Sequence, residues 1–409
     1  MPSQSPVPSH GPASAGKGLV VLQVIPRMQA GGAERTTVEI TTALTARGDT
    51  ALVATAGGRL LAEIEAAGGE PVILPVDAKS PWAVWRNRAR LMAVIRARGV
   101  DVVHARSRAP AWSALWAARA CGVPFVTTYH GTYTDQGALK RFYNSVMARG
   151  DRVIANSRFI AERIARTYDL PAERLAVIPR GVDPALFDPA AVTPDRLFTL
   201  REAWGLTQDG RPIVLLPARL TGWKGHLVLI EAVRRLSGQE APGFVTVLAG
   251  DPERNRRYGL EIDAAVAAAG LAGHVKRPGH CADMAAAYAL ADVVVSPATA
   301  PEAFGRVAIE AQAMGRPVIV ADHGGARETV IDGKTGWRVA PGDAAALARA
   351  LSNALALGPE ARAALGARAR QHSVETYSVH QMCVKTLHIY DQLAQASAAG
   401  QPRRQPAQA

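Results

Sequence analysis

The sequence predicts an α/β protein with two Rossmann-like, doubly wound domains that face a central cleft. Short apolar segments of strand length alternate with helical segments along most of the chain, which is typical of parallel sheets covered by helices on both faces. The chain has 409 residues, more than one hydrophobic core usually organises, so we expect two domains. In such sheets ligands bind at the carboxyl ends of the strands, and two of these edges would line the cleft.

The first domain is expected over residues 18–190. Its strands are apolar and rich in Val and Ile, and they are expected at 18–26, 51–57, 71–76, 100–105, 124–131, 152–157 and 175–183. Helical segments separate several of them, at 36–48, 61–69, 81–99 and 112–122. A stretch with Pro and Asp over 184–210 then interrupts the alternation and marks the domain boundary.

The second domain is expected over residues 191–376. Its expected strands are 212–220, 244–251, 274–279, 291–298, 316–322 and 335–341. Its helices are expected at 226–238, at 260–273, after Glu302, and at 343–356. A further helix over 377–396 is expected to pack back on the first domain.

The two chain ends differ in composition from the rest. Residues 1–17 are rich in Pro, Ser, Gly and Ala and have no apolar core of a signal peptide, so they predict a disordered leader. Residues 397–409 predict a disordered tail. No apolar run reaches the length that spans a bilayer, and the three cysteines, Cys121, Cys281 and Cys383, fit neither a disulfide framework nor a zinc site.

The net charge of +12 is unevenly distributed, with eight of the excess positive charges in residues 1–190. A basic first half favours an anionic partner, such as nucleic acid, an anionic membrane or a phosphorylated substrate, although a general arginine bias explains it equally well. Segment 81–99 sets Trp82 and Trp85 against five arginines, and 137–150 adds Lys140, Arg141 and Phe142. The first segment either lies on an anionic membrane or packs its tryptophans on the sheet.

Two loops have the composition of phosphate-binding loops. Gly31 and Gly32 follow the first strand and precede a helix, where they allow backbone amides to approach a phosphate or sugar, or simply form a tight turn with positive φ. Arg219 and Lys224 lie between a strand and a helix, where two cations suit the two charges of a diphosphate, or are solvated loop charges.

The segment PEAFGRVAIEAQAMGRP at 301–317 holds two glutamates eight positions apart, on either side of a helix start. Glu310 lies about two turns into this helix, where a carboxylate needs polar partners. Two vicinal sugar hydroxyls are such partners, and backbone amides near Phe304 and Gly305 can bind oxygen atoms of a sugar or phosphate. Glutamate is also a good helix former, so the spacing of the two glutamates does not by itself show that they bind a ligand.

Taken in order, these motifs resemble those of the retaining glycosyltransferases of family 4, which have the GT-B fold and include enzymes of bacterial envelope polysaccharide and lipopolysaccharide synthesis. The resemblance covers residues 18–393. In the second half the matching segments are 217–225, 247–251 and 291–339. In the first half they are 31–35, 101–107, 127–133, 153–159 and 177–183.

The resemblance implies a role for each matching residue of the donor segment. Glu310 would bind the ribose hydroxyls of the nucleotide, and Glu302 would contact the donor sugar. The backbone around Phe304, Gly305 and Arg306 would hold sugar hydroxyls and the diphosphate.

It also implies roles outside that segment. Arg219 and Lys224 would neutralise the leaving diphosphate, Gly31 and Gly32 would lie beside the donor phosphate and the acceptor, and His130 would lie near the donor sugar.

Three positions depart from the commonest pattern of the family. Arg106 stands where a second histidine often follows His104, Arg180 stands where Asn is frequent, and Arg306 stands where an apolar residue is frequent. These arginines could favour an anionic donor or acceptor.

The resulting prediction is a retaining, metal-independent hexosyltransferase that uses a UDP- or GDP-sugar and needs no further cofactor. Its acceptor would be a glycan or lipid-linked molecule of lipopolysaccharide or another envelope glycan. Retention would follow from front-face attack, in which the leaving phosphate helps to deprotonate the acceptor and His130 positions the sugar. We expect a cytoplasmic protein, peripheral on the inner face of the plasma membrane, with no nucleic-acid partner.

Two other interpretations stay open at this point. One is another GT-B enzyme, such as a nucleotide-sugar 2-epimerase, and the other is a non-catalytic basic binding protein. A dehydrogenase is disfavoured because no GxGxxG motif opens either domain.

Overall fold

The computed structural model describes residues 18–29, 31–133, 137–237, 243–251 and 255–400. Contacts group the chain into two compact units, one holding the residues up to Val126 together with those from Leu387 onward, the other running from Thr127 to Thr386. Among the described residues, no helix combines the length and the apolar character needed to cross a bilayer.

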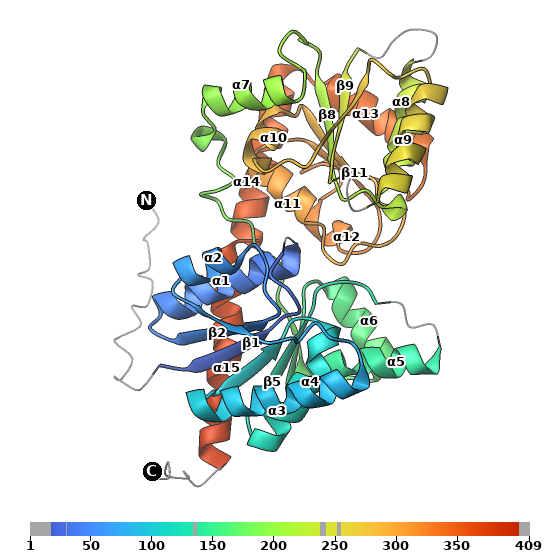
Figure 1. The fold of residues 1–409 in the computed structure, drawn as a ribbon. Helices are drawn as coiled ribbons and strands as arrows, with labels where there is room; N and C mark the ends of the chain where they lie inside the picture. The colour runs from blue at the N-terminus through green and yellow to red at the C-terminus, as the bar shows by residue number, and fades with distance from the viewer. Residues whose placement is uncertain (1–17, 30, 134–136, 238–242, 252–254, 401–409) are drawn as a thin grey trace, which may run out of the picture. The chain divides into compact units, whose positions relative to one another are not determined.

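The first sheet has the strand order β3-β2-β1-β4-β5-β6-β7 (Figure 1). Its strands are β1 Val20–Val24, β2 Thr50–Thr55, β3 Glu70–Ile73, β4 Val102–Ala105, β5 Phe125–Tyr129, β6 Arg152–Ala155 and β7 Leu175–Val177. The helices in this part of the chain are α1 Gly32–Ala46, α2 Leu61–Ala66, α3 Pro81–Arg98, α4 Arg108–Cys121, α5 Ala138–Asn144 and α6 Arg158–Tyr168. Strand β1 pairs in parallel with both β2 and β4, so the chain order reverses at β1.

The second sheet has the order β10-β9-β8-β11-β12-β13. Its strands are β8 Ile213–Pro217, β9 Val245–Ala249, β10 Val275–Gly279, β11 Val293–Ser296, β12 Val318–Ala321 and β13 Trp337–Val339. Its helices are α7 Pro194–Ala203, α8 His226–Ser237, α9 Arg256–Ala268, α10 Met284–Leu290, α11 Arg306–Ala313, α12 Ala326–Thr329, α13 Ala344–Leu355 and α14 Pro359–Thr376. The strands pair in parallel, and the order reverses between β8 and β11, which confirms the prediction of doubly wound parallel sheets.

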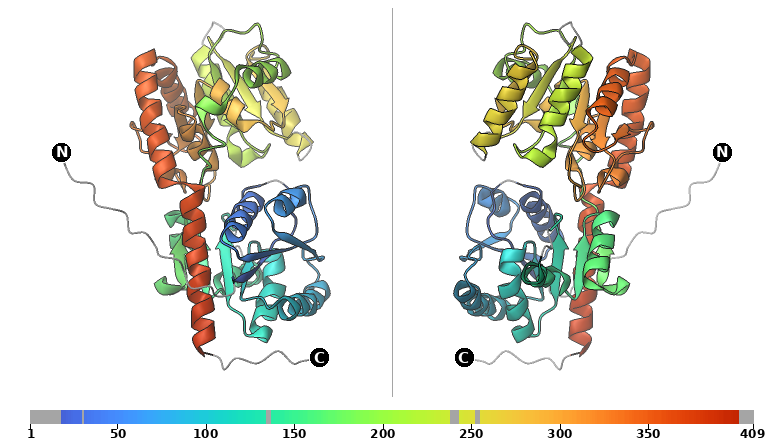
Figure 2. Two further views of the ribbon diagram at one scale, coloured as in Figure 1. Left: turned by 90° about the vertical axis from the view of Figure 1, so that its left-hand side faces the viewer. Right: turned by 90° about the vertical axis from the view of Figure 1, so that its right-hand side faces the viewer.

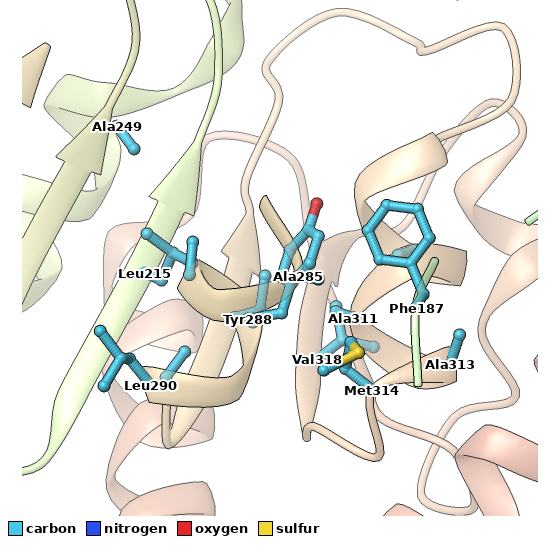
Figure 3. Packing of buried hydrophobic residues seen from close by; sticks show 14 of the residues in the cluster. Phe187, Leu215, Ala249, Ala285, Tyr288, Leu290, Ala311, Ala313, Met314 and Val318 are labelled. Carbon is cyan, nitrogen blue, oxygen red and sulfur yellow. The ribbon is translucent and has the colours of Figure 1, made fainter. Parts of the chain in front are cut away.

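Strand β8 shows why helices cover both faces of the second sheet. Because successive side chains of a strand point to opposite faces, Leu215 packs into one apolar cluster with α10 and α11, whereas Val214 and Leu216 pack into another with α8 and α13. Figure 2 shows helices on both sides of this sheet. Figure 3 shows the first cluster, in which Leu215 and Val318 lie close to Tyr288 of α10 and Met314 at the end of α11.

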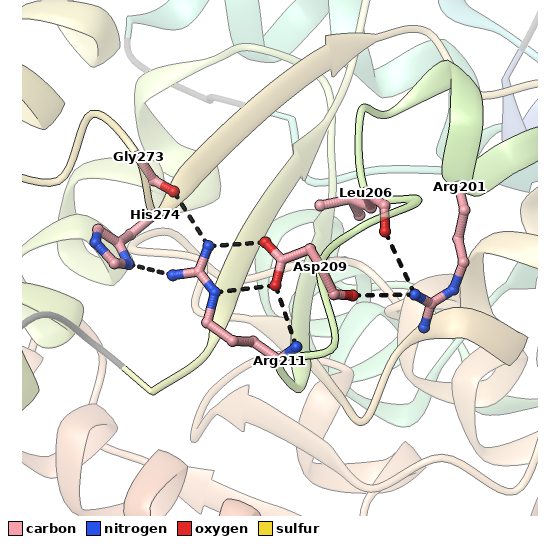
Figure 4. Close-up of polar contacts among 6 residues, drawn as sticks. All are labelled: Arg201, Leu206, Asp209, Arg211, Gly273 and His274. Carbon is pink, nitrogen blue, oxygen red and sulfur yellow. Dashed lines mark hydrogen bonds and ion pairs between the residues drawn. The ribbon is translucent and has the colours of Figure 1, made fainter.

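The strands of the second sheet begin at an edge that we call the amino edge (Figure 4). Arg211, just before β8, donates to both carboxylate oxygens of Asp209 at 2.7 and 3.0 Å, to His274 Nδ1 at 2.5 Å and to the Gly273 carbonyl at 3.3 Å. Arg201 of α7 donates to the Asp209 carbonyl at 3.2 Å. These bonds tie the chain before β8 to the chain before β10.

The last helix, α15 Val379–Gly400, contributes residues to both units. In the first unit the Tyr390 hydroxyl lies 2.6 Å from His104 Nδ1, and Arg47 pairs with Asp391 at 2.8 Å. The helix runs to Gly400, so the prediction of a disordered tail is wrong for 397–400, where alanines favour continued helix. Residues 1–17 and 401–409 lie outside the described residues, and the domain limits 18–190 and 191–376 stay predictions.

Candidate functional site

The opposite edge of the second sheet, which we call the carboxyl edge, carries most of the predicted site residues. Strand β8 leads into the loop with Arg219 and Lys224, and β11 leads into the loop with Glu302 and then into α11. The chain order reverses between these two strands, and ligands of parallel sheets usually bind at such a reversal. The sequence motifs therefore meet at the topological switch point of the sheet.

Lys224 and Glu302 form an ion pair across this point. The Lys224 Nζ atom lies 2.6 Å from Glu302 Oε1, and each side chain is only 12% exposed. Ser296, the last residue of β11, donates its hydroxyl to the same carboxylate oxygen at 3.3 Å. Each of the two charges thus has a partner, as charges with little exposure require.

The loops that carry this pair are in backbone contact. The amide of Thr299 donates to the Trp223 carbonyl at 2.8 Å. Gly225 has a φ of +80°, and a Cβ atom there would lie 2.0 Å from the Pro297 carbonyl oxygen. Gly225 is therefore required both by its conformation and by the close approach of the β11 loop.

His226 follows this loop directly and begins α8. Its side chain is fully buried, and it packs edge-on against the Tyr258 ring at 5.6 Å. Burial, together with the positive charge of Lys224, lowers the pKa of His226 to about 4. The imidazole is therefore neutral at physiological pH.

Helix α11 begins between the two glutamates. Its N-cap, Gly305, has φ +95° and ψ 63°, a left-handed conformation that side chains other than glycine's rarely adopt. Among the described residues no side chain caps this helix end, so its first amides can bind an anion. The Phe304 ring is buried against Tyr377, which leaves only its backbone for a ligand.

Glu310 lies on the second turn of α11. Its Oε2 atom accepts a hydrogen bond from the Tyr288 hydroxyl at 2.9 Å, and its Oε1 atom accepts one from Arg306 Nε at 3.0 Å. The Glu310 side chain keeps 12% exposure and Arg306 keeps 25%. The carboxylate is thus held by two donors and still reaches the surface.

The Glu302 loop is held from two further sides. The Gly325 amide donates to the Glu302 carbonyl at 2.9 Å, and the Ser157 hydroxyl donates to the Ala303 carbonyl at 2.6 Å. The Glu328 carboxylate accepts from the first two amides of α6, at 2.8 and 2.9 Å. Neither Ser157 nor Glu328 is among the predicted site residues, although both lie in segments that carry the resemblance.

Arg219 differs from the other cations at this edge. Its side chain is exposed and has no hydrogen-bond or ion-pair partner among the residues that the structure describes. An exposed guanidinium in the same loop as Lys224, without a counter-charge among the described residues, is available to an anionic ligand.

His130 follows β5 and lies beside Arg180. The buried Arg180 side chain donates from Nη2 to His130 Nδ1, so the ring proton of a neutral His130 is on Nε2. The other two unusual arginines are also bonded within the chain, Arg106 to Gln23 at 2.8 Å and Arg306 to Glu310. Their expected preference for an anionic substrate therefore gains no support from these contacts.

Gly31 and Gly32 belong to the first unit and begin helix α1. Gly31 is the N-cap with a φ of 166°, which is extended backbone, so the tight turn with positive φ is not formed there. A Cβ atom at Gly31 would lie 2.6 Å from Glu34 Oε2, the end of a flexible side chain. The structure therefore brings together Lys224, Glu302 and the start of α11 in one unit, with the glycine pair in the other.

Helix α3 carries the predicted basic segment. Trp82 and Trp85 are 65% and 53% exposed and stack on each other at 5.2 Å, so the interpretation that they pack on the sheet is wrong. The buried face of this helix consists of Asn87, Leu91 and Ile95. On α5 of the second unit, Leu139 and Phe142 are also exposed.

In the described parts of the chain, no three His, Cys, Asp or Glu side chains come together in a way that could hold a metal ion.

Comparisons with known proteins identify the family of this chain. The model of "Glycosyltransferase Family 4" matches residues 30–186, and that of "Glycosyl transferases group 1" matches residues 201–372. The chain is 33% identical over 285 residues to a D-inositol 3-phosphate glycosyltransferase of Xylanimonas cellulosilytica, with 66% of this chain and 67% of that one covered. It is 32% identical over 248 residues to a GDP-mannose-dependent alpha-(1-6)-phosphatidylinositol monomannoside mannosyltransferase of Mycolicibacterium smegmatis, with 59% and 61% covered.

Among solved structures, a glycosyltransferase from Rickettsia africae matches with a TM-score of 0.84 and 33% identity. That alignment covers 92% of this chain and 99% of the Rickettsia chain. Two parallel Rossmann-like sheets, the pair of glutamates around α11 and these matches lead to one conclusion: the chain is a glycosyltransferase that belongs to family 4 and has the GT-B fold.

Proposed function

We propose that this glycosyltransferase moves a sugar from a UDP- or GDP-sugar to a glycan or lipid-linked acceptor, with retention of anomeric configuration and without a metal ion. The observation that carries the proposal is the carboxyl edge of the second sheet, where Lys224–Glu302 and Arg306–Glu310 flank the uncapped start of α11. A nucleotide-diphosphate sugar has a charged centre between two hydroxyl-rich ends. The carboxyl edge has groups for both parts of such a donor: cations and helix amides for the diphosphate, and two carboxylates for the hydroxyls.

The diphosphate would bind to Lys224, Arg219 and the first amides of α11. When the sugar leaves, negative charge grows on the outer phosphate, and fixed positive groups stabilise that charge most where water is excluded. Lys224 is mostly buried, and the helix N-terminus adds partial positive charge, so both are set before the donor arrives. Arg219 is exposed and would close on the diphosphate as the donor binds.

The two glutamates would fix the two ends of the donor. Glu310 would accept from the ribose hydroxyls and Glu302 from hydroxyls of the transferred sugar, with the backbone of Phe304, Gly305 and Arg306 between them. For Gly31 and Gly32 we keep the role that the sequence motif implies, contact of their backbone with the donor phosphate and the acceptor.

His130 would donate from Nε2 to the transferred sugar, because Arg180 occupies Nδ1. A ring held in this way is suited to positioning and not to taking a proton. In the transfer step the bond between the anomeric carbon and the phosphate oxygen breaks, and the acceptor oxygen bonds to the same face of that carbon. The acceptor proton passes to the departing phosphate, which gives retention without a protein base.

The acceptor is proposed to be a glycan or lipid-linked molecule of lipopolysaccharide or another envelope glycan. By their names, the two relatives act on D-inositol 3-phosphate and on phosphatidylinositol monomannoside, which both carry phosphate. We also propose that the enzyme is cytoplasmic and peripheral on an anionic membrane, and the exposed Trp82–Trp85 pair next to the arginines of α3 supports the membrane part of this proposal.

The test of the proposal is nucleotide release from a panel of UDP- and GDP-sugars, with product anomers read by NMR. The expected result is turnover of one donor in the presence of chelator, with a product that keeps the donor's anomeric configuration. A variant with Glu310→Gln should turn over the same donor with a higher KM. An inverted product, or strict dependence on an added divalent cation, contradicts the proposal.

The membrane part needs its own test, flotation with vesicles that contain anionic lipid. The wild type should float at low salt, and Trp82→Ser/Trp85→Ser should stay in the bottom fraction with unchanged nucleotide release. Equal behaviour of the two proteins contradicts membrane docking by α3.

A further inference from the structure

Tyr288 has a polar hydroxyl group, although it occupies a core position at which an apolar side chain would be expected. Its side chain is 1% exposed and lies in the apolar cluster of the second sheet, with its ring 6.0 Å from that of Phe187. In Figure 3 its hydroxyl oxygen points away from the packed side chains around it. A buried hydroxyl is unfavourable without a partner, and here the partner is Glu310 Oε2 at 2.9 Å.

The Glu310 carboxylate accepts a second hydrogen bond, from a donor on a different helix from Tyr288. Arg306 Nε bonds Glu310 Oε1 at 3.0 Å from one turn earlier in the same helix, whereas Tyr288 approaches from α10. Each carboxylate oxygen therefore has one donor, and the two donors come from separate elements. This arrangement fixes both the rotamer of Glu310 and the plane of its carboxylate.

The remaining capacity of Glu310 matches two adjacent hydroxyls. A carboxylate has about four acceptor positions, two on each oxygen. With one position on each oxygen taken, one on each is left, and the side chain is still 12% exposed. Two vicinal hydroxyls can then bind side by side, one to each oxygen.

The Tyr288 hydroxyl is a dependable donor for this purpose. Burial, and then the negative charge of Glu310, raise the pKa of Tyr288 well above its ordinary value, so the phenol keeps its proton at any pH at which the enzyme works. Holding Glu310 in one conformation beforehand removes an ordering penalty that the nucleotide would otherwise meet on binding.

We propose that Tyr288 is a positioning residue of the donor site, which sets the Glu310 carboxylate so that each of its oxygens accepts one ribose hydroxyl. The inference rests on the proposed function, because it assumes that a nucleotide binds at this edge. It assigns discrimination between ribose and deoxyribose to a residue that never touches the nucleotide.

The test is calorimetric titration of wild type and Tyr288→Phe with the nucleotide diphosphate of the preferred donor and with its 2′-deoxy and 3′-deoxy forms. The wild type should bind the ribonucleotide at least about tenfold more tightly than either deoxy form. In Tyr288→Phe the ribonucleotide should bind about five- to tenfold more weakly, with the deoxy forms little changed. A purely structural role would instead weaken all three nucleotides by the same factor.

Tyr390→Phe is the matched control, because it also removes a buried hydroxyl that has a partner, His104, but in the first unit. It should leave ribose discrimination unchanged. In a Glu310→Gln background, Tyr288→Phe should have no further effect on discrimination. If Tyr288→Phe does not fold, Tyr288→Met, which keeps an apolar side chain without a hydroxyl, replaces it.

Two negative results have different meanings. Unchanged discrimination in Tyr288→Phe, or an equal loss for all three nucleotides, overturns the role of Tyr288 and leaves the proposed function standing. Failure of the wild type to bind any nucleotide diphosphate overturns the proposed function, and the inference falls with it.

Discussion

The two edges of the second sheet contain the same kinds of charged residues in different states. At the amino edge, Arg211 divides its donors among Asp209, His274 and the Gly273 carbonyl (Figure 4). At the carboxyl edge, Arg219 has no partner among the described residues, and α11 begins without a side-chain cap. Ion pairs at the first edge complete the structure, whereas those at the second leave groups that can still bind a ligand.

The ion pairs of the two edges also differ in how far apart their members lie in the sequence. Asp209 and Arg211 are two residues apart, so their bond forms from local chain geometry. Lys224 and Glu302 are 78 residues apart and meet only because two loops leave the sheet at its switch point. Variants placed at matched positions on the two edges should therefore separate loss of stability from loss of function.

The largest effect is expected for Lys224→Met at the carboxyl edge. Removing a cation that stabilises a leaving diphosphate should lower kcat/KM by about 10³-fold. It should also lower the free energy of unfolding by roughly 3 kcal/mol, because Glu302 is left charged and mostly buried. Steady-state kinetics and urea unfolding measure both effects.

The double variant Lys224→Met/Glu302→Gln is the control for that result. It should regain most of the lost stability and none of the turnover. Recovery of turnover together with stability would mean that the pair is structural, like the pairs of the amino edge.

A smaller effect is expected for Arg219→Gln, compared with Arg211→Gln at the amino edge. Arg219→Gln should lower kcat/KM by about 10²-fold and change the free energy of unfolding by less than about 0.5 kcal/mol, because the side chain is exposed and pairs with none of the residues that the structure describes. Arg211→Gln should keep kcat/KM and lose roughly 1 kcal/mol of stability. If the two variants behaved alike, the contrast between the edges would be refuted.

The edges should also respond to acid in different pH windows. The pKa of His226 in the folded protein is about 4, below its ordinary value of 6.5. Between these two pH values the unfolded chain therefore binds more protons than the folded one. The free energy of unfolding falls as the pH drops through this range, by about 2 kcal/mol at pH 5. Asp209 has a lowered pKa because of its bonds from Arg211, so its contribution is present above its ordinary value of 3.8 and is lost below it.

Urea unfolding between about pH 7.5 and 4 measures the first window. The stability difference between wild type and His226→Gln should shrink steadily as pH falls from about 6.5, since the variant lacks the titrating group. A difference that stays constant with pH would show that His226 titrates normally.

The smallest effect compares two glycines. Gly305→Ala, at a φ of +95°, should lose roughly 1 kcal/mol of stability and raise the KM for the donor, since the start of α11 must shift. Gly210→Ala, between Asp209 and Arg211, has open space and no positive φ, so it should leave both quantities unchanged or slightly raise stability. Thermal unfolding and donor kinetics distinguish the two outcomes.

The strand and helix pattern could be predicted from the sequence because hydrophobic periodicity and loop motifs are local signals. The charged groups of the carboxyl edge were found in the same way, since each lies in a short motif. Tyr288 was not found, because within the Ala-rich segment 284–290 it is typical of an ordinary core residue. Its role depends on a contact with Glu310 that only the packing of α10 on α11 creates.

Two other features depended on three-dimensional packing as well. The bond from Ser157 to the Ala303 carbonyl joins residues 146 positions apart, and no local pattern signals such a bond. The sequence of the basic helix α3 is compatible with either buried or exposed tryptophans. In the structure the helix buries the face that carries Asn87, Leu91 and Ile95, and this leaves the tryptophans exposed.

We propose that the carboxyl edge of the second sheet is a preformed site for a nucleotide diphosphate. Calorimetric titration with UDP and GDP tests it most directly, in the wild type and in the Arg219→Gln/Lys224→Met variant. We expect saturable binding of one of the two nucleotides by the wild type and at least about 100-fold weaker binding by the variant. Equal binding by the two proteins would contradict it.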